Sequence, residues 1–122
     1  MIVNPLHLPV LDAAGYAPRH EVTDPAKAAA IAADLTARGW HGAPVVVLAD
    51  HARALTGVHR LAAAAQAGLD FVPGVDAEAL LAACSVDLWE RRAEFVDLDD
   101  ALERLLTELP AEVCEAYGLD LG

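Results

Sequence analysis

Four consecutive residues, Gly57-Val58-His59-Arg60, combine a turn, an imidazole and a guanidinium where an apolar run gives way to an alanine-rich segment. The apolar run is typical of a strand, and the segment from about Val58 to Ala67 is typical of a helix. The first N–H groups of a helix have no partner within it, and the helix dipole attracts negative charge there. This stretch therefore predicts one of two things: an anion-binding corner, or an ordinary strand–turn–helix with a surface arginine.

The residues before this corner predict a helix and a buried strand. Asp24 and Pro25 are typical of a helix start, and the helix is expected to run from Ala26 to Arg38, with Gly39 ending it. The run Pro44–Ala49 is apolar on both faces, which predicts a central strand. The other elements predicted up to residue 75 are a shorter strand at Ala52–Thr56 and a third strand within Leu69–Val75, whose Pro73 favours an edge or a strand end.

From Asp76 onward the pattern is helical. The predicted helices are one capped by Asp76 and running to Ala83, a short one at Leu88–Phe95, one opened by Asp99-Asp100, and one from Pro110 to Tyr117 that Gly118 ends. We therefore expect an α+β fold. Residues 1–75 would form a small mixed sheet with packed helices, and residues 76–122 an acidic helical extension packed on it.

The charge of the chain is strongly negative and unevenly distributed. The 122 residues carry a formal net charge of −11. Residues 1–75 hold six acidic and five basic residues, whereas residues 76–122 hold thirteen acidic and three basic ones. Such a charge argues against nonspecific nucleic-acid binding and against binding to an anionic membrane surface. No apolar run approaches the roughly 20 residues that span a bilayer, so we expect a cytoplasmic protein.

Several short motifs recur in the order and at the spacing of a known superfamily. They are Gly39-Trp40, Pro44-Val45-Val46-Val47, Leu55-Thr56-Gly57-Val58-His59-Arg60 with the alanines that follow, Ala67-Gly68, and Val72-Pro73. This set resembles the ParB/sulfiredoxin superfamily over about residues 22–75. The residues after Asp76 lie outside this shared region and resemble the acidic tail of small phage-type ParB-like proteins.

The resemblance implies a nucleotide phosphate site for ATP or CTP, with Mg²⁺ and with NTP hydrolysis or phosphotransfer as the activities of interest. The residues that it places at this site are Lys27, Thr56, Gly57, Val58, His59 and Arg60. Arg60 is expected to make bidentate contacts with phosphate oxygens. Val58 stands at the position of the sulfiredoxin cysteine, and a valine is not a thiolate nucleophile, so sulfiredoxin chemistry is not expected.

Two acidic residues near the first helix are the catalytic candidates. By resemblance to ParB-like free-serine kinases, Glu21 or Asp24 would act as a general base or bind Mg²⁺ on the triphosphate. The alternative interpretation of Asp24 is a helix N-cap. The sequence shows no cluster with the spacing of a protein metal site.

Two other functions remain open. Some ParB-like domains resemble nucleases, and the basic corner would then hold a backbone phosphate. The acidic residues 76–122 would instead suit a basic protein partner, or would imitate the charge of DNA, with the ParB-like body as a scaffold.

Overall fold

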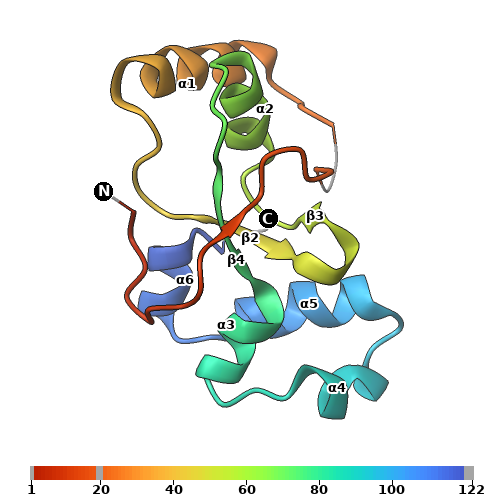
Figure 1. The fold of residues 1–122 in the computed structure, drawn as a ribbon. Coiled ribbons are helices and arrows are strands. Elements are labelled where there is room, and N and C mark those ends of the chain that lie inside the picture. The colour runs from red at the N-terminus through yellow and green to blue at the C-terminus, as the bar shows by residue number, and fades with distance from the viewer. Residues whose placement is uncertain (1, 19–20, 120–122) are drawn as a thin grey trace.

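The structure, a computed structural model, describes residues 2–18 and 21–119. Its elements in chain order are β1 (Leu11–Asp12), α1 (Pro25–Arg38), β2 (Val45–Leu48), the 3-10 helix η1 (Ala49–His51), β3 (Arg53–Ala54), α2 (Val58–Gln66), β4 (Pro73–Asp76), α3 (Ala77–Ala83), α4 (Leu88–Arg91), the 3-10 helix η2 (Arg92–Glu94), α5 (Leu98–Thr107) and α6 (Ala111–Tyr117). This is the α+β fold that the sequence predicts. A four-stranded mixed sheet lies between α1 and α2 on one side and α3 to α6 on the other (Figure 1).

The sheet is organised around β2. The strand order is β1-β4-β2-β3, and β2 pairs antiparallel with β3 and parallel with β4, while β1 pairs antiparallel with β4. All four residues of β2 are buried, so the prediction of a central strand within Pro44–Ala49 is confirmed. The predicted third strand is β4, which lies inside the sheet and begins at Pro73. Pro73 thus occupies the strand end, where a missing N–H is tolerated.

Small side chains form the core between the sheet and the pair α1 and α2. Val45 and Val47 point to this side and share the cluster with Leu35 and Leu61. Helix α1 begins as predicted, because the Asp24 carboxylate accepts a hydrogen bond from the Lys27 N–H at 3.0 Å. The two helices make extensive contact along their length, which fixes the direction in which α2 leaves the sheet.

A larger core lies on the other face of the sheet. Val46 and Leu48 of β2 point to this side and pack with leucines of α3 and α5, such as Leu80 and Leu105. The predicted boundary between residues 75 and 76 falls inside β4, at Val75-Asp76. The helices of residues 76–119 therefore share one core with the sheet.

Three helix starts and ends differ from the prediction. Asp76 does not cap α3 with its side chain, because its carboxylate accepts the Ala49 N–H at 3.1 Å and so joins β4 to η1. The helix predicted at Leu88–Phe95 is the short α4 followed by the 3-10 turn η2. Helix α5 starts at Leu98, because Asp97 is the cap and accepts the Asp100 N–H at 2.8 Å.

A polar contact that the sequence does not predict joins the two ends of the described chain. The Tyr117 hydroxyl donates to Asn4 Oδ1 at 2.6 Å and accepts the Leu6 N–H at 3.0 Å. Asn4 in turn holds both the N–H and the carbonyl of Leu8. Tyr117 is fully buried, and burial raises the pKa of its hydroxyl. Within the described residues, no helix has both the length and the apolar character needed to cross a membrane.

Tyr117→Phe should destabilise the fold, because it leaves the partly buried Leu6 N–H without its acceptor and Asn4 Oδ1 without the donor that Tyr117 supplies. We expect a loss of about 1–2 kcal/mol in the free energy of unfolding, measured by urea denaturation. Tyr16→Phe is the matched control, since no hydrogen bond to the Tyr16 hydroxyl is found among the described residues, and it should change stability by less than about 0.5 kcal/mol. Equal effects of the two substitutions would contradict this account.

Candidate functional site

The predicted corner exists and opens helix α2. Gly57 is its N-cap, with φ 68° and ψ 35°, a left-handed conformation that glycine adopts without strain. The first bond of the helix runs from the Leu61 N–H to the Gly57 carbonyl at 2.8 Å. The N–H groups of Val58, His59 and Arg60 precede it, and they have no acceptor in the described parts of the chain. These are the groups that a bound anion uses at a helix N-terminus.

Thr56 fixes this corner to the sheet. Its hydroxyl accepts the Val46 N–H at 3.0 Å, and its own N–H donates to the Val46 carbonyl at 3.3 Å. The Leu55 N–H donates to the same carbonyl at 2.8 Å. Thr56 is buried, so the structure places its side chain against β2, one residue before the turn.

His59 joins the beginnings of two helices. Its Nε2 accepts the backbone N–H of Asp24 at 3.1 Å and lies 3.5 Å from the Thr23 hydroxyl. Since Nε2 accepts in this bond, the ring proton resides on Nδ1. The N-cap of α1 is therefore held directly beside the first turn of α2, and the positive ends of two helix dipoles lie close together.

Three other predicted site residues lie at the start of α1. Lys27 is exposed in the first turn of α1, and no partner of its ammonium group is found in the described regions. Asp24 is exposed and uses one carboxylate oxygen as the N-cap, which is the alternative that the sequence offered for it. Glu21 is exposed and lies just before the helix. The described residues contain no group of three or more His, Cys, Asp or Glu that could hold a metal ion.

Arg60 turns toward the protein. Its two terminal nitrogens donate to the carbonyls of Ala43 at 2.6 Å and His41 at 2.8 Å. Its guanidinium also lies over the Trp40 ring, 4.0 Å from the centroid, which is a cation–π contact. Burial lowers the pKa of Arg60. Arg60 therefore holds the loop between α1 and β2 against α2, and the carbonyls of that loop already occupy its two terminal nitrogens.

The same loop is anchored a second time by Asp34. Asp34 Oδ2 bonds His41 Nε2 at 2.7 Å, and Oδ1 accepts a hydrogen bond from Arg38 Nε at 2.7 Å. These bonds, that of His41 first and that of Arg38 second, lower the pKa of Asp34. His41 thus has its ring held by Asp34 and its carbonyl held by Arg60.

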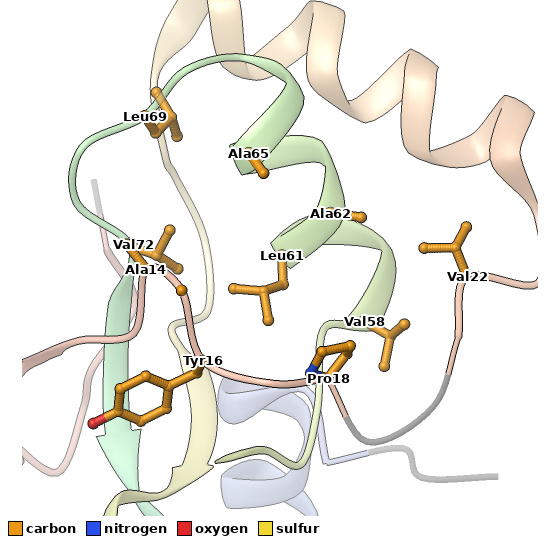
Figure 2. A pocket seen from close by; sticks show the side chains of 11 residues that line it. Ala14, Tyr16, Pro18, Val22, Val58, Leu61, Ala62, Ala65, Leu69 and Val72 are labelled. Carbon is orange, nitrogen blue, oxygen red and sulfur yellow. The ribbon is translucent and has the colours of Figure 1, made fainter. Parts of the chain in front are cut away.

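An apolar cavity of about 280 Å³ adjoins the corner. One wall is α2, from Val58 at its first turn through Leu61 and Ala65. The facing wall comes from the segment before α1, of which the described residues Ala14, Gly15, Tyr16, Pro18 and Val22 line the cavity (Figure 2). Figure 2 shows the Leu61 side chain between the helix and this segment, and the Tyr16 hydroxyl directed away from the helix. Sequence reasoning missed this cavity, because its two walls come from segments about 40 residues apart and carry only ordinary apolar residues.

Comparisons of the chain with protein families, with curated proteins and with solved structures found no match.

Arg60→Lys should destabilise the protein even without a ligand. A lysine ammonium cannot donate to both carbonyls in the same fork or stack on Trp40 in the same way. We expect a loss of about 1–3 kcal/mol in the free energy of unfolding by urea denaturation. Arg104→Lys is the matched control, because Arg104 is exposed and forms its ion pair with Asp100 one turn earlier on the same helix. This substitution should cost less than about 0.5 kcal/mol. If Arg60→Lys lowers the free energy of unfolding no more than the control does, the structural role assigned to Arg60 is wrong.

The contribution of Asp34 should depend on pH. A carboxylate with a lowered pKa stabilises the fold above its ordinary value of 3.8, and the contribution is lost as the pH falls through the folded-state pKa. The difference in melting temperature between the unaltered protein and Asp34→Asn should be largest near pH 7 and should shrink below pH of about 4. The exposed Asp70, which has no ion pair among the described residues, supplies the control Asp70→Asn. A pH-independent difference for Asp34→Asn would contradict the assignment.

Proposed function

We propose that this chain binds the phosphate groups of a nucleotide, ATP or CTP, at the joined beginnings of α1 and α2. The observation that carries the proposal is the hydrogen bond from the Asp24 N–H to His59, which holds the two helix starts side by side. Two positive helix ends and an exposed lysine beside them suit a multiply charged anion better than one helix end alone.

Each residue of the corner has a defined part in this proposal. The N–H groups of Val58, His59 and Arg60 would donate to phosphate oxygens, and Lys27 would add a charge-assisted contact. The Arg60 side chain supports the corner instead of contacting the ligand, because its terminal nitrogens already donate to two carbonyls. This supporting role differs from the expectation that the Arg60 side chain contacts the phosphate oxygens.

The resemblance to the ParB/sulfiredoxin superfamily supports the same proposal. Its motif places a nucleotide at the Gly-x-x-Arg turn, which is Gly57 to Arg60 in this chain. Val58 replaces the sulfiredoxin cysteine, and its side chain is buried at the wall of the cavity. A binding role, with hydrolysis or phosphotransfer as its extension, therefore fits this corner better than sulfur chemistry.

The apolar cavity beside Val58 offers a place for the nucleotide base. Its walls are mostly aliphatic side chains, and Tyr16, which has the one hydroxyl group among the lining side chains, directs that group away from α2 in Figure 2. Aliphatic side chains exclude water and pack on the face of a base, but they form no hydrogen bonds with its polar edge that would distinguish one base from another. The proposal therefore gives little preference between ATP and CTP.

Carboxylates near the corner make Mg²⁺ part of the proposal. Glu21 and Asp24 precede or cap α1, so a triphosphate bound there would lie close to two negative side chains. Mg²⁺ favours phosphate oxygens together with one or two carboxylates, and it would offset this repulsion. Glu21 and the remaining Asp24 oxygen are the groups that would bind the ion or accept a proton in phosphotransfer.

Titration calorimetry with ATP and with CTP, each with and without Mg²⁺, tests the proposal. We expect saturable binding, stronger with Mg²⁺, and at least fivefold weaker binding after Lys27→Ala, because a charge-assisted phosphate contact contributes roughly 1.5–3 kcal/mol. Arg38→Ala removes the same charge at the far end of α1 and should change affinity less than twofold. Release of inorganic phosphate, measured in the same samples, reports hydrolysis.

Two outcomes would overturn the proposal. One is the absence of saturable binding at millimolar nucleotide by a protein that circular dichroism shows to be folded. The other is an equal loss of affinity in Lys27→Ala and Arg38→Ala, which would indicate a general charge effect instead of a site at the joined helix starts.

A further inference from the structure

A second cavity, of about 490 Å³, lies beside α3 and α4 in the helical half of the molecule. Its walls include the indole of Trp89 and two acidic residues, Glu78 of α3 and Asp87 at the N-cap of α4. None of these residues lines the cavity beside α2. The cavity is therefore separate from the site proposed for the nucleotide.

The aromatic wall of this cavity is exposed and yet fixed. Trp89 is 56% exposed, the highest value for an aromatic residue in the described ranges. Its Nε1–H donates to Glu78 Oε1 at 2.8 Å, and this bond holds the indole of Trp89 on α4 against α3. Asp87 Oδ1 accepts the N–H groups of Trp89 and Glu90, each at 3.1 Å. An indole held in this way presents a preformed surface to solvent instead of completing the core.

The described residues supply no cation that pairs with the carboxylates of this cavity. Neither Glu78 nor Asp87 forms an ion pair with a lysine, arginine or histidine among the residues that the structure describes. By contrast, Arg53, Arg91 and Arg104 are all paired with other carboxylates. The cavity thus combines two carboxylates with an aromatic surface, and the described residues that line it include no lysine, arginine or histidine.

We propose that this cavity binds the guanidinium of an arginine in a basic segment of a partner protein. A guanidinium stacks on an indole and donates several hydrogen bonds to carboxylates at the same time. The surplus of ten negative charges in residues 76–122 would attract such a segment and keep anionic partners away. Arg60 and Trp40 already form the same kind of pair inside this protein, at 4.0 Å.

Binding of a fluorescently labelled basic peptide, followed by anisotropy, tests this inference. The probe is the nonapeptide Gly-Ser-Lys-Gly-Arg-Gly-Lys-Ser-Gly, and its partner probe has citrulline, which is neutral and of nearly the same shape, in place of arginine. We expect the arginine peptide to bind at least fivefold more tightly than the citrulline peptide. The shift of the Trp89 indole N–H signal in a heteronuclear NMR titration should locate the site.

Variants of the protein separate the cavity from a general effect of charge. Glu78→Gln keeps an oxygen for the Trp89 N–H and removes the charge, and Trp89→Leu removes the ring; each should weaken binding of the arginine peptide at least fivefold. Glu115→Gln, on the exposed side of α6, is the matched control and should change binding less than twofold. Nucleotide binding should be the same in all three variants.

The proposal is overturned if the citrulline and arginine peptides bind equally, or if Glu115→Gln weakens binding as much as Glu78→Gln. It is also overturned if methylguanidinium alone binds as tightly as the peptide, which would indicate a site for a small free cation. Because the measurements use the whole chain and a second variant, a folding defect in Trp89→Leu alone does not decide the result.

Discussion

Strand β2 is buried on both faces, and the two cores of the molecule are built on it. Val45 and Val47 belong to the core under α1 and α2, and Val46 and Leu48 belong to the core under the later helices. A shift of the strand by one residue would exchange the two sets, so its register is strongly fixed. The backbone of Val46 also holds Thr56, and so the strand fixes the turn from which α2 starts.

At the start of α2, side chains hold the corner in place, and backbone N–H groups are the donors available to a ligand. Arg60 is partly removed from water, and its guanidinium is satisfied by carbonyls and by Trp40, so its role is to position the loop. His59 brings α1 to the same place. The N–H groups at the start of α2 remain without an acceptor among the described residues, and the exposed Lys27 lies on the neighbouring helix. A ligand at this corner would thus meet backbone donors first, which suits the uniform oxygens of a phosphate.

The features that could be predicted from the sequence are those with local physical causes. Helix α1 follows from the cap at Asp24 and the stop at Gly39, and β2 follows from an uninterrupted apolar run. The start of α2 follows from a glycine before an alanine-rich segment. In each case a few neighbouring residues decide the structure, and the pattern of the sequence contains them.

The features that could not be predicted depend on partners far away in the chain. The carbonyls that hold Arg60 lie 17 and 19 residues earlier, and Tyr117 meets Asn4 across 113 residues. The position of Asp76 in the sequence predicts a side-chain cap for α3, but its carboxylate accepts the Ala49 N–H at the start of η1 instead. Every residue carries a main-chain carbonyl, so the sequence does not indicate which carbonyls will accept hydrogen bonds from an arginine. An arginine bound to carbonyls and one available to bind a phosphate therefore cannot be distinguished from the sequence.

A heteronuclear NMR titration of the isotope-labelled protein with Mg²⁺-ATP is the decisive test of phosphate binding at the joined beginnings of α1 and α2. The account predicts saturable shifts concentrated in the backbone N–H signals of Val58, His59 and Arg60, with the signals of α5 unchanged. It also predicts that the side-chain Nε–H signal of Arg60 moves little, because that guanidinium stays on its carbonyls. Shifts centred on α3 to α6, or the absence of any saturable shift at millimolar nucleotide, would contradict it.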